Sequence, residues 1–164
     1  MKMFRIYLWQ FFANNIAGFV LMPIRIRTLI YKLLGMEINN NGFEPNIKFY
    51  GKNISIGKGT YINQNCYFNN FAKISIGENC FLAPNVSLIT PTHEIGDSEK
   101  RAGNFYAKEV NIEDGVWVGA NVTIMPGVQV GKGCVIGAGS VVTKDCQPNG
   151  LYVGIPAKRI RTLN

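Results

Sequence analysis

Residues 112–147 read IEDGVWVGANVTIMPGVQVGKGCVIGAGSVVTKDCQ and decide the fold, because they repeat every six residues. A β-branched aliphatic residue opens six consecutive hexads, namely Ile112, Val118, Ile124, Val130, Ile136 and Val142. Chance rarely places aliphatic side chains at so many successive steps of one period. A fixed short period is typical of architectures in which one small structural unit stacks on the next.

Two shorter runs with the same period come before this segment. One opens hexads at Ile56, Ile62, Phe68 and Ile74, and the other at Ile76, Leu82 and Leu88. The fifth place of each hexad is also restricted. Positions 60, 66, 80, 86, 116, 122, 128, 134, 140 and 146 hold only Thr, Cys, Val or Ser. The side chains at the first and fifth places of each hexad are therefore expected to face the interior, and the fifth place has less room.

The hexads indicate a coil with three short, flat strands per turn, in which like positions lie over one another. Gly and Asn beside the hexad starts suit tight corners, some with positive φ. Such turns cannot bury their apolar faces alone, so they stack. No helical period is visible after about residue 40, which excludes alternating strands and helices. A length of 164 residues with 47% hydrophobic residues fits one folded domain.

The pattern resembles that of the hexapeptide-repeat acyltransferases, and most closely the maltose, galactoside and nodulation-factor O-acetyltransferases. The resemblance covers residues 55–161 and rests on ISIGENCFLAPNVSLITPTH, VWVGANVTIMPGVQVGKGCVIGAGSVVTKD and GIPAKRIR. It implies an all-β fold, a left-handed parallel β-helix of hexapeptide repeats, that works as a homotrimer with active sites between subunits. The handedness comes from the resemblance, since the general crossover rule favours the right hand.

We divide the chain into three segments. Residues 1–36 form a short N-terminal amphipathic helical segment, residues 37–150 the β-helix, and residues 151–164 a C-terminal tail that binds the coenzyme. Hexad starts stop at position 88 and resume at position 112, so the polar residues 90–110 form one extruded loop. Long loops inside compact repeats are usually functional. We expect this loop to reach over a neighbouring subunit and close the acceptor pocket.

The N-terminal segment holds most of the net charge of +7, because residues 1–36 contain Lys2, Arg5, Arg25, Arg27 and Lys32 and no acid. The uncharged run 6–24 leaves three alternatives: a helix in the interface of an anionic membrane, helices packed on the body of the protein, or a transmembrane helix. Three amide side chains and Pro23 within the run weigh against the transmembrane helix, because buried amides are costly in lipid.

Acetyl transfer from a thioester to a sugar hydroxyl needs a base for the hydroxyl proton, donors for the oxyanion and a groove for the carrier. His93, the only histidine, lies in TPTHEIG (residues 90–96), where the repeat is interrupted. The resemblance aligns it with the family's catalytic histidine, and it aligns the backbone N–H of Ala120 with the oxyanion donor. Glu94 and Asp97 are the nearest acids, and the sequence leaves open which of them, if either, orients the imidazole.

The resemblance also implies residues that contact the acceptor. Asn63 and Trp117 align with acceptor-binding positions, and Tyr61 and Gln64 lie close enough to share the pocket. The alternatives are a bend residue for Asn63 and, for Trp117, an aromatic that covers the neighbouring coil. Relatives that act on free sugars carry an acid where this chain has Phe71, and they carry further N-terminal acids. These two differences leave the identity of the acceptor open, but they do not change the expected donor.

The resemblance places acetyl-CoA along the coils between subunits. The residues implied in coenzyme binding are Ala83, Ala120, Ala138, Ser140, Thr143, Lys144, Lys158 and Arg161. Small side chains leave room for a pantetheine arm, and the cations of PAKRIR suit the coenzyme's phosphates. The alternative for each cation is a solvated charge near the C-terminus.

No metal site is expected. The zinc-dependent carbonic anhydrases that share this fold need three histidines per metal ion, and this chain has one. The cysteines at positions 66, 80, 134 and 146 all occupy the fifth place of a hexad and show no CxxC spacing. We interpret them as small buried hydrophobes in a reduced compartment.

Together these patterns predict an acetyl-CoA-dependent O-acetyltransferase that modifies a sugar hydroxyl. The apolar, basic N-terminus favours a surface-polysaccharide, lipopolysaccharide or capsule precursor as acceptor, and a cytoplasmic enzyme held at the inner face of the membrane. The alternatives are an acetyltransferase of a free small sugar or xenobiotic, and a non-catalytic β-helix scaffold. Nucleic acid is not expected as a partner, because the cations gather at the chain ends and do not alternate with aromatic residues along one face.

Overall fold

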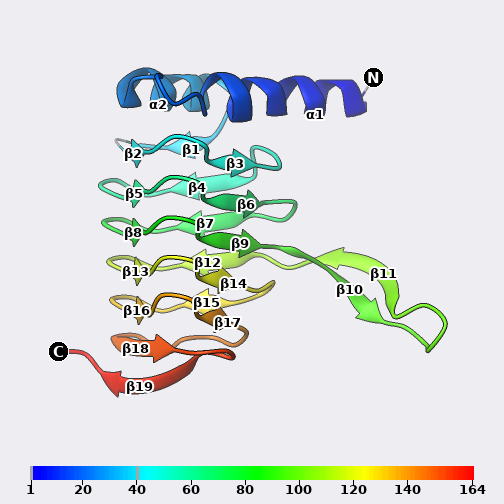
Figure 1. The fold of residues 1–164 in the computed structure, drawn as a ribbon, viewed down its shortest axis with the longest axis vertical. Coiled ribbons are helices and arrows are strands. Elements are labelled where there is room, and N and C mark those ends of the chain that lie inside the picture. The colour runs from blue at the N-terminus through cyan, green and yellow to red at the C-terminus, as the bar shows by residue number, and fades with distance from the viewer. Residues whose placement is uncertain (1, 40) are drawn as a thin grey trace.

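The computed structural model describes residues 2–39 and 41–164 (Figure 1). Most of these residues form a solenoid whose turns consist of three short strands, each lying against the equivalent strand of the next turn. The hexad starts and the fifth places point into the solenoid and are buried. The predicted fold class, a parallel β-helix of hexapeptide repeats with a short N-terminal helical segment and one extruded loop, is confirmed.

Three sheets form the faces of the solenoid, which we name A, B and C. Face A contains β1 (Glu37–Ile38), β4 (Ile54–Ile56), β7 (Ile74–Ile76), β12 (Val110–Ile112) and β15 (Gln129–Val130). Face B contains β2 (Gly42–Phe43), β5 (Tyr61–Ile62), β8 (Phe81–Leu82), β13 (Trp117–Val118), β16 (Val135–Ile136), β18 (Gly150–Val153) and β19 (Lys158–Thr162). Face C contains β3 (Lys48–Phe49), β6 (Tyr67–Asn69), β9 (Ser87–Ile89), β14 (Thr123–Ile124) and β17 (Val141–Val142).

Neighbouring strands of each face are parallel and in register, except that β19 pairs antiparallel with β18. Val118, for example, lies between Leu82 of the preceding turn and Ile136 of the next. Because the register keeps hexad starts above one another, their side chains stack into continuous apolar ladders. These ladders form the core of the protein.

Residues with positive φ turn the corners. Asn65, Asn85 and Asn121 lie one above the other between faces B and C, with φ of 61°, 60° and 58°. Apart from Gly, Asn is among the residues that enter this region most readily. The Asn85 amide also donates to Oδ1 of Asn121 at 3.1 Å, so corner residues of successive turns bind each other.

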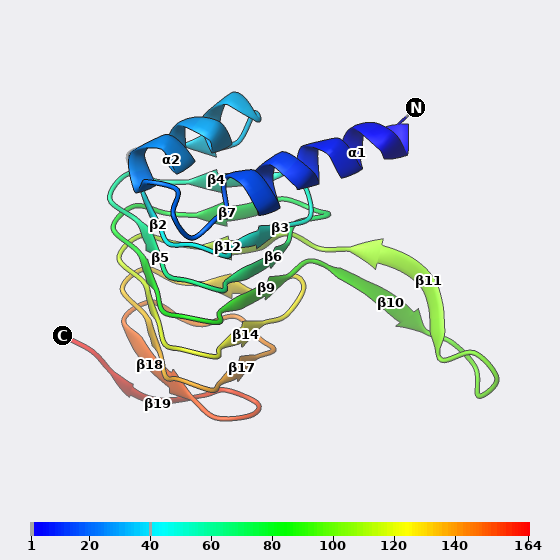
Figure 2. The same ribbon diagram turned by 45° about the horizontal axis from the view of Figure 1, so that its top comes forward.

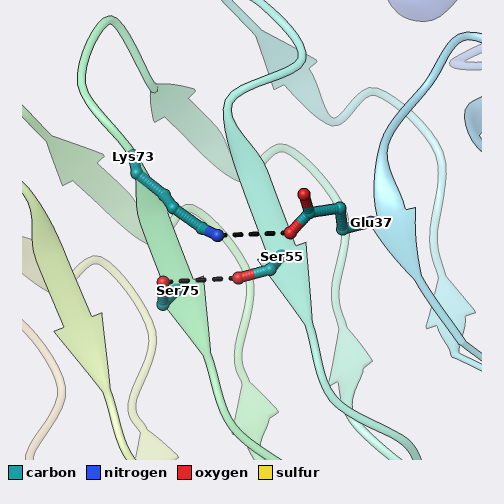
Figure 3. Close-up of polar contacts among 4 residues, drawn as sticks. All are labelled: Glu37, Ser55, Lys73 and Ser75. Atoms are coloured by element: carbon teal, nitrogen blue, oxygen red, sulfur yellow. Dashed lines mark hydrogen bonds and ion pairs between the residues drawn. The ribbon is translucent and has the colours of Figure 1, made fainter.

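Polar groups on the outside of face A also connect the turns (Figure 3). Ser55 on β4 lies opposite Ser75 on β7, and their Oγ atoms are 3.3 Å apart. Lys73 Nζ lies 3.2 Å from Oε2 of Glu37 on β1. Both partners of this ion pair are substantially exposed, so it contributes little to stability.

Helices cap the N-terminal end of the solenoid (Figures 1 and 2). They are α1 (Lys2–Phe11), the π-helical turn η1 (Phe12–Ile16) and α2 (Ile24–Leu33). Asn14 binds the backbone of Phe49 twice, accepting from its N–H at 2.8 Å and donating to its carbonyl at 2.9 Å. Gln10 donates to the Tyr50 carbonyl at 2.8 Å. These amides, which weighed against a transmembrane helix, therefore bind the first turn of the solenoid.

The uncharged run 6–24 is not one continuous helix, since residues 17–23 separate η1 from α2. Within residues 2–39 and 41–164, no helix combines the length and the apolar character that crossing a membrane would need.

Arg27 fixes the helical cap to the solenoid. Its side chain is buried, and its guanidinium group donates to the carbonyl oxygens of Ala17, Phe19, Met22 and Phe43. Four carbonyl dipoles thus take the place of a counter-ion. The N-terminal cations were expected to give the segment a basic surface, but Arg27 does not contribute to that surface.

Residues 90–110, predicted as an extruded loop, form an antiparallel hairpin. It consists of β10 (Pro91–Ile95) and β11 (Ala102–Ala107), with an irregularity in register after His93. The hairpin leaves the solenoid at the corner between faces C and A and extends away from it (Figures 1 and 2). His93 pairs with Phe105 across the hairpin, so the histidine lies on an arm of regular structure.

Candidate active site

His93 lies on β10 with an exposed side chain. Its Nδ1 atom is 3.0 Å from the carbonyl oxygen of Gly103 on β11. A carbonyl oxygen only accepts hydrogen bonds, so we infer that Nδ1 carries a proton. This contact selects, for the neutral ring, the tautomer whose lone pair lies on Nε2, which is the one that a general base requires.

The two acids that the sequence left open as orienting partners are engaged elsewhere. Glu94 Oε2 accepts from Asn104 Nδ2 at 2.9 Å. Asp97 Oδ1 accepts two backbone N–H groups at the tip of the hairpin, at 3.1 and 3.0 Å. In this chain the carbonyl of Gly103 orients the imidazole. Sequence analysis missed this residue because a backbone carbonyl leaves no side-chain signal.

A row of aromatic rings connects His93 with the corner between faces C and A. The imidazole contacts Phe105 edge to face, with ring centroids 5.6 Å apart. Phe105 contacts Phe71 in the same way at 4.8 Å, and Phe71 lies 5.8 Å from Tyr50. On this side the surroundings of the histidine are apolar, because they consist of the Phe105 and Phe71 rings. Phe71 stands at the position where we expect an acid in the related enzymes that act on free sugars.

Ala120 lies at the corner between faces B and C, two residues after the end of β13. Its carbonyl accepts from the N–H of Gly139 at 2.8 Å, but its own N–H has no acceptor among the described residues. The N–H groups of Gly119 and Asn121, on either side, both donate within the solenoid. An uncommitted backbone N–H on a fixed corner is the kind of donor that stabilises an oxyanion.

The outer surface of face B carries a column of three aromatic side chains. Tyr61 stacks on Phe81, with centroids 5.4 Å apart and planes 6° from parallel, and Trp117 pairs with Phe81 on the next strand. Trp117 is 54% exposed. The Tyr61 hydroxyl donates to the Glu44 carboxylate, and this hydrogen bond raises the pKa of Tyr61 to about 12. Glu44 is a neighbour of the predicted acceptor residues that sequence analysis missed.

Asn63 follows β5 at the same corner as Ala120. Its Oδ1 accepts from the backbone N–H of Gln64 at 2.9 Å, and the Gln64 side chain is exposed. Asn63 therefore acts as a bend residue in this chain. Contact of Asn63, Gln64, Tyr61 or Trp117 with an acceptor stays a prediction.

The residues predicted to bind the coenzyme occupy two corners and the last strand. Ala83, Ala120 and Ala138 lie at the corner between faces B and C, Thr143 and Lys144 between faces C and A, and Lys158 and Arg161 on β19. Ser140 differs from the others, because it is completely buried and its Oγ accepts from the Gly154 N–H at 3.0 Å. Ser140 thus fixes the C-terminal turn, and its contact with a coenzyme stays a prediction.

The candidate base on the hairpin lies apart from Ala120 and Trp117 within one chain. The hairpin with His93 projects on the opposite side of the solenoid from face B with Trp117 (Figures 1 and 2). Exposure of both groups leaves them free to meet another copy of the chain.

The four cysteines are free and buried, as interpreted from their places in the hexads. Burial raises the pKa of the Cys66 thiol to about 11 and that of Cys146 to about 12. It also raises the pKa of Cys80 and of Cys134. Because only the thiolate is a good nucleophile, these side chains are structural.

Residues 109–144 match the family described as bacterial transferase hexapeptide (six repeats). A Schizosaccharomyces pombe protein named as an acetyltransferase is 48% identical over 151 residues, which cover 92% of this chain and 73% of that protein. The chain belongs to the hexapeptide-repeat acetyltransferases. With a fungal protein among its relatives, the likeness is not confined to bacteria.

Two solved structures show how far the likeness of this hexapeptide-repeat acetyltransferase extends. A maltose O-acetyltransferase from Clostridium difficile 630 is 38% identical with a TM-score of 0.86, covering 98% of this chain and 85% of that one. A hexapeptide-repeat acetyltransferase from Vibrio cholerae, solved in complex with acetyl-coenzyme A, is 30% identical with a TM-score of 0.85, covering 98% and 86%. Both comparisons therefore include the helical cap as well as the solenoid.

Proposed function

We propose that this protein transfers the acetyl group of acetyl-CoA to a hydroxyl of a sugar in a surface-polysaccharide, lipopolysaccharide or capsule precursor, with His93 as general base. The observation that carries the proposal is the contact between His93 Nδ1 and the Gly103 carbonyl, which leaves Nε2 as an exposed base. Its relatives support the donor and the sugar class, since one is a maltose O-acetyltransferase and another was solved with acetyl-coenzyme A.

The chemistry proceeds without a covalent enzyme intermediate. Nε2 of His93 takes the proton of the acceptor hydroxyl while the hydroxyl oxygen attacks the thioester carbonyl carbon. The Ala120 N–H binds the negative charge that develops on the carbonyl oxygen. The C–S bond then breaks, and the leaving thiolate takes the proton from the imidazolium. The products are the acetyl ester and free coenzyme A.

This mechanism uses two copies of the chain at each site. His93 and Ala120 belong to groups that one chain keeps apart, so the hairpin of one subunit reaches the corner between faces B and C of its neighbour. We propose a homotrimer, as the resemblance to the hexapeptide-repeat acyltransferases implies, and its closed cyclic symmetry would give every hairpin a partner corner. Acetyl-CoA then lies between subunits, with Lys158 and Arg161 available to its phosphates.

The helical cap supports a membrane-associated acceptor. Its outer surface carries apolar side chains that are each at least half exposed: Met3, Phe4, Tyr7, Phe11, Phe19, Val20, Leu21, Leu29 and Leu33. Exposed Arg5, Arg25 and Lys32 accompany them, and the segment contains no acid. Exposed apolar side chains with cations in the same segment suit the interface of an anionic membrane, where lipid-linked glycans are accessible. We therefore propose a cytoplasmic enzyme that lies on the inner face of the membrane.

Two alternative functions differ from this proposal: an acetyltransferase of a free small sugar, and a non-catalytic scaffold. The likeness to a maltose O-acetyltransferase favours a free small sugar as acceptor, but Phe71 and the basic cap do not resemble a site for a neutral, soluble sugar. A non-catalytic scaffold would have no need for an oriented imidazole.

Release of free thiol from acetyl-CoA tests the proposed reaction. The purified protein is offered acetyl-CoA with free mono- and disaccharides, nucleotide sugars and lipid-linked glycans. We expect thiol release with lipid-linked or polymeric glycans and little with free sugars. Turnover with free sugars alone would show that the acceptor is a free small sugar. No turnover with any of the offered acceptors would favour the non-catalytic scaffold.

Co-sedimentation with vesicles tests the membrane contact. We expect binding to phosphatidylglycerol vesicles, weak binding to neutral vesicles, and loss of binding in the double variant Leu21→Asp, Leu33→Asp. Ile95→Asp is the matched control, because Ile95 is 89% exposed but lies on the hairpin. Equal sedimentation of both variants, or no binding to either vesicle, would exclude the cap as a membrane surface.

A further inference from the structure

A cavity of about 510 Å³ lies between α1 and the first turns of the solenoid. Its apolar walls include Ile6 and Trp9 from α1, and Tyr50 and Phe71 from the solenoid. Arg5 and Lys52 also line it. This volume is typical of sites that enclose most of a small molecule, and such sites combine apolar walls with a few charged groups.

Hydrogen bonds hold the walls of this cavity in place. Trp9 Nε1 donates to the Leu34 carbonyl at 2.8 Å, which fixes the indole ring and uses its polar atom. Asn70 is completely buried, and its Oδ1 accepts from the N–H groups of Tyr50 and Gly51 at 3.0 and 2.9 Å. Asn53, which also lines the cavity, donates to the Phe71 carbonyl at 2.9 Å. The cavity is therefore a formed part of the fold.

Two aromatic rings, Phe71 and Phe105, connect the cavity with the candidate catalytic base of the same chain. Phe71 forms part of its wall and also contacts Phe105, the ring that packs against His93. A molecule that filled the cavity and extended from its Phe71 end along the Phe105 ring would bring the attached group toward the imidazole. The opposite end lies at α1, whose outer surface is apolar.

We propose that this cavity binds the hydrocarbon chain and phosphate of a lipid-linked acceptor, with the attached sugar directed toward His93. The aromatic and aliphatic walls suit the hydrocarbon, and Arg5 and Lys52 suit the phosphate through charge-assisted contacts. Among the described lining residues there is no acid to repel it. The direction of the sugar rests on the proposed function, whereas binding of the amphiphile does not require acetyl transfer.

Calorimetry with farnesyl phosphate, below its aggregation concentration, tests this inference on the full-length protein. Farnesol and inorganic phosphate are the comparison ligands. We expect saturable binding of farnesyl phosphate at one site per chain, binding of farnesol at least about tenfold weaker, and no measurable binding of inorganic phosphate. Equal affinity for the alcohol and the phosphate ester would overturn the role of the two cations.

Variants locate the site. Phe71→Asp is expected to weaken farnesyl phosphate binding about tenfold or more, because it places a carboxylate beside the hydrocarbon and near the phosphate. The double variant Arg5→Gln, Lys52→Gln is expected to remove the preference for phosphate over alcohol. Lys58→Gln is the matched control for charge, since Lys58 is an exposed lysine at the other end of β4. Tyr67→Ala is the control for loss of an exposed aromatic ring.

Three outcomes separate this inference from the proposed function. Normal farnesyl phosphate binding without acetyl transfer to any glycan would leave the cavity assignment intact and remove the reaction. Acetyl transfer to glycans with farnesyl phosphate binding unchanged in Phe71→Asp would overturn the cavity assignment alone. Displacement of farnesyl phosphate by octanoyl-CoA, but not by acetyl-CoA, would assign the cavity to a longer acyl donor and would also overturn the inference.

Discussion

A backbone carbonyl, and not an acid, orients the imidazole of His93. We therefore expect His93→Ala to lower the turnover number by about 10²- to 10⁴-fold, because it removes the base. Glu94→Gln and Asp97→Asn are expected to retain turnover within about threefold, since neither carboxylate contacts the ring in this chain. Thiol release from acetyl-CoA measures all three variants.

The binding of acetyl-CoA by His93→Ala is the control for this series, and it is expected to be unchanged. If Glu94→Gln lost as much turnover as His93→Ala, an acid would orient the ring in the assembled enzyme. Unchanged turnover in His93→Ala would exclude the histidine from the mechanism.

The sequence pointed to His93 itself for a physical reason, since an interrupted ladder on both sides marks an extruded segment. It could not identify Gly103, because the contact uses a carbonyl that every residue carries. It could not identify the packing of Phe105 either, which depends on the register of a hairpin that the sequence did not reveal. The role of a side chain could thus be predicted only where the hexad repeat, or its interruption, indicates where the residue lies in the fold.

The buried thiols make stability depend on pH. Cys66 is completely buried, and burial raises its pKa from the ordinary value of 9.0 to about 11. A group whose pKa is raised on folding contributes stability that is fully present below the unfolded pKa and is lost as pH rises through the folded pKa. We therefore expect the free energy of unfolding to fall between about pH 9 and pH 11 as thiols ionise in the unfolded chain.

Urea unfolding at several pH values between 7.5 and 11 measures this effect. Cys66→Val is the comparison, because Val86 occupies the equivalent place in the next turn. The variant is expected to lose less stability over this range than the parent protein. Identical pH dependence of the two proteins would show that Cys66 ionisation does not contribute.

At the scale of elements, the strands and the presence of an N-terminal helical segment were predictable, whereas the packing of that segment on the solenoid was not. Each strand is fixed by a local rule, since a hexad start faces inward wherever it falls. The cap depends on contacts between distant residues, such as Asn14 with Phe49 and Arg27 with Phe43. The uncharged run 6–24 therefore left three alternatives open, and only the packing revealed where its amides bind.

The cap contains two buried polar side chains with opposite expected effects on stability. Arg27 satisfies four backbone carbonyls, whereas the Tyr31 hydroxyl is buried without a hydrogen-bond partner among the described residues. We expect Arg27→Met to lower the free energy of unfolding by about 3 kcal/mol, because it leaves buried carbonyls unpaired. Tyr31→Phe is expected to leave it unchanged or to raise it by up to about 1 kcal/mol.

Urea denaturation followed by circular dichroism measures both variants. The two side chains lie on the same helix and are equally buried, so each serves as the control for general disruption of α2. A loss of stability in Tyr31→Phe comparable to that in Arg27→Met would mean that the hydroxyl has a partner in solution.

At the scale of the whole molecule, the fold separates the two halves of the proposed chemistry. The ladders make a rigid solenoid, and the hairpin carries His93 away from it, on the side opposite face B (Figure 1). The imidazole and the Ala120 N–H therefore belong to separate parts of one chain. Subunit contact would therefore determine activity, and enzyme diluted below its assembly concentration would lose turnover even while each solenoid stayed folded.

Mixing of two inactive variants tests this directly. His93→Ala lacks the base, and Ala120→Pro lacks the N–H that binds the oxyanion. Proline should be tolerated there, because Pro84 occupies the equivalent corner of the preceding turn. If each site takes the hairpin of one subunit and the corner of another, random mixing at equal amounts leaves about a quarter of the interfaces with both groups intact. We expect thiol release to recover to about a quarter of the parent rate after the mixture is dissociated and reassembled. Sites confined to single chains would leave the reassembled mixture as inactive as its components.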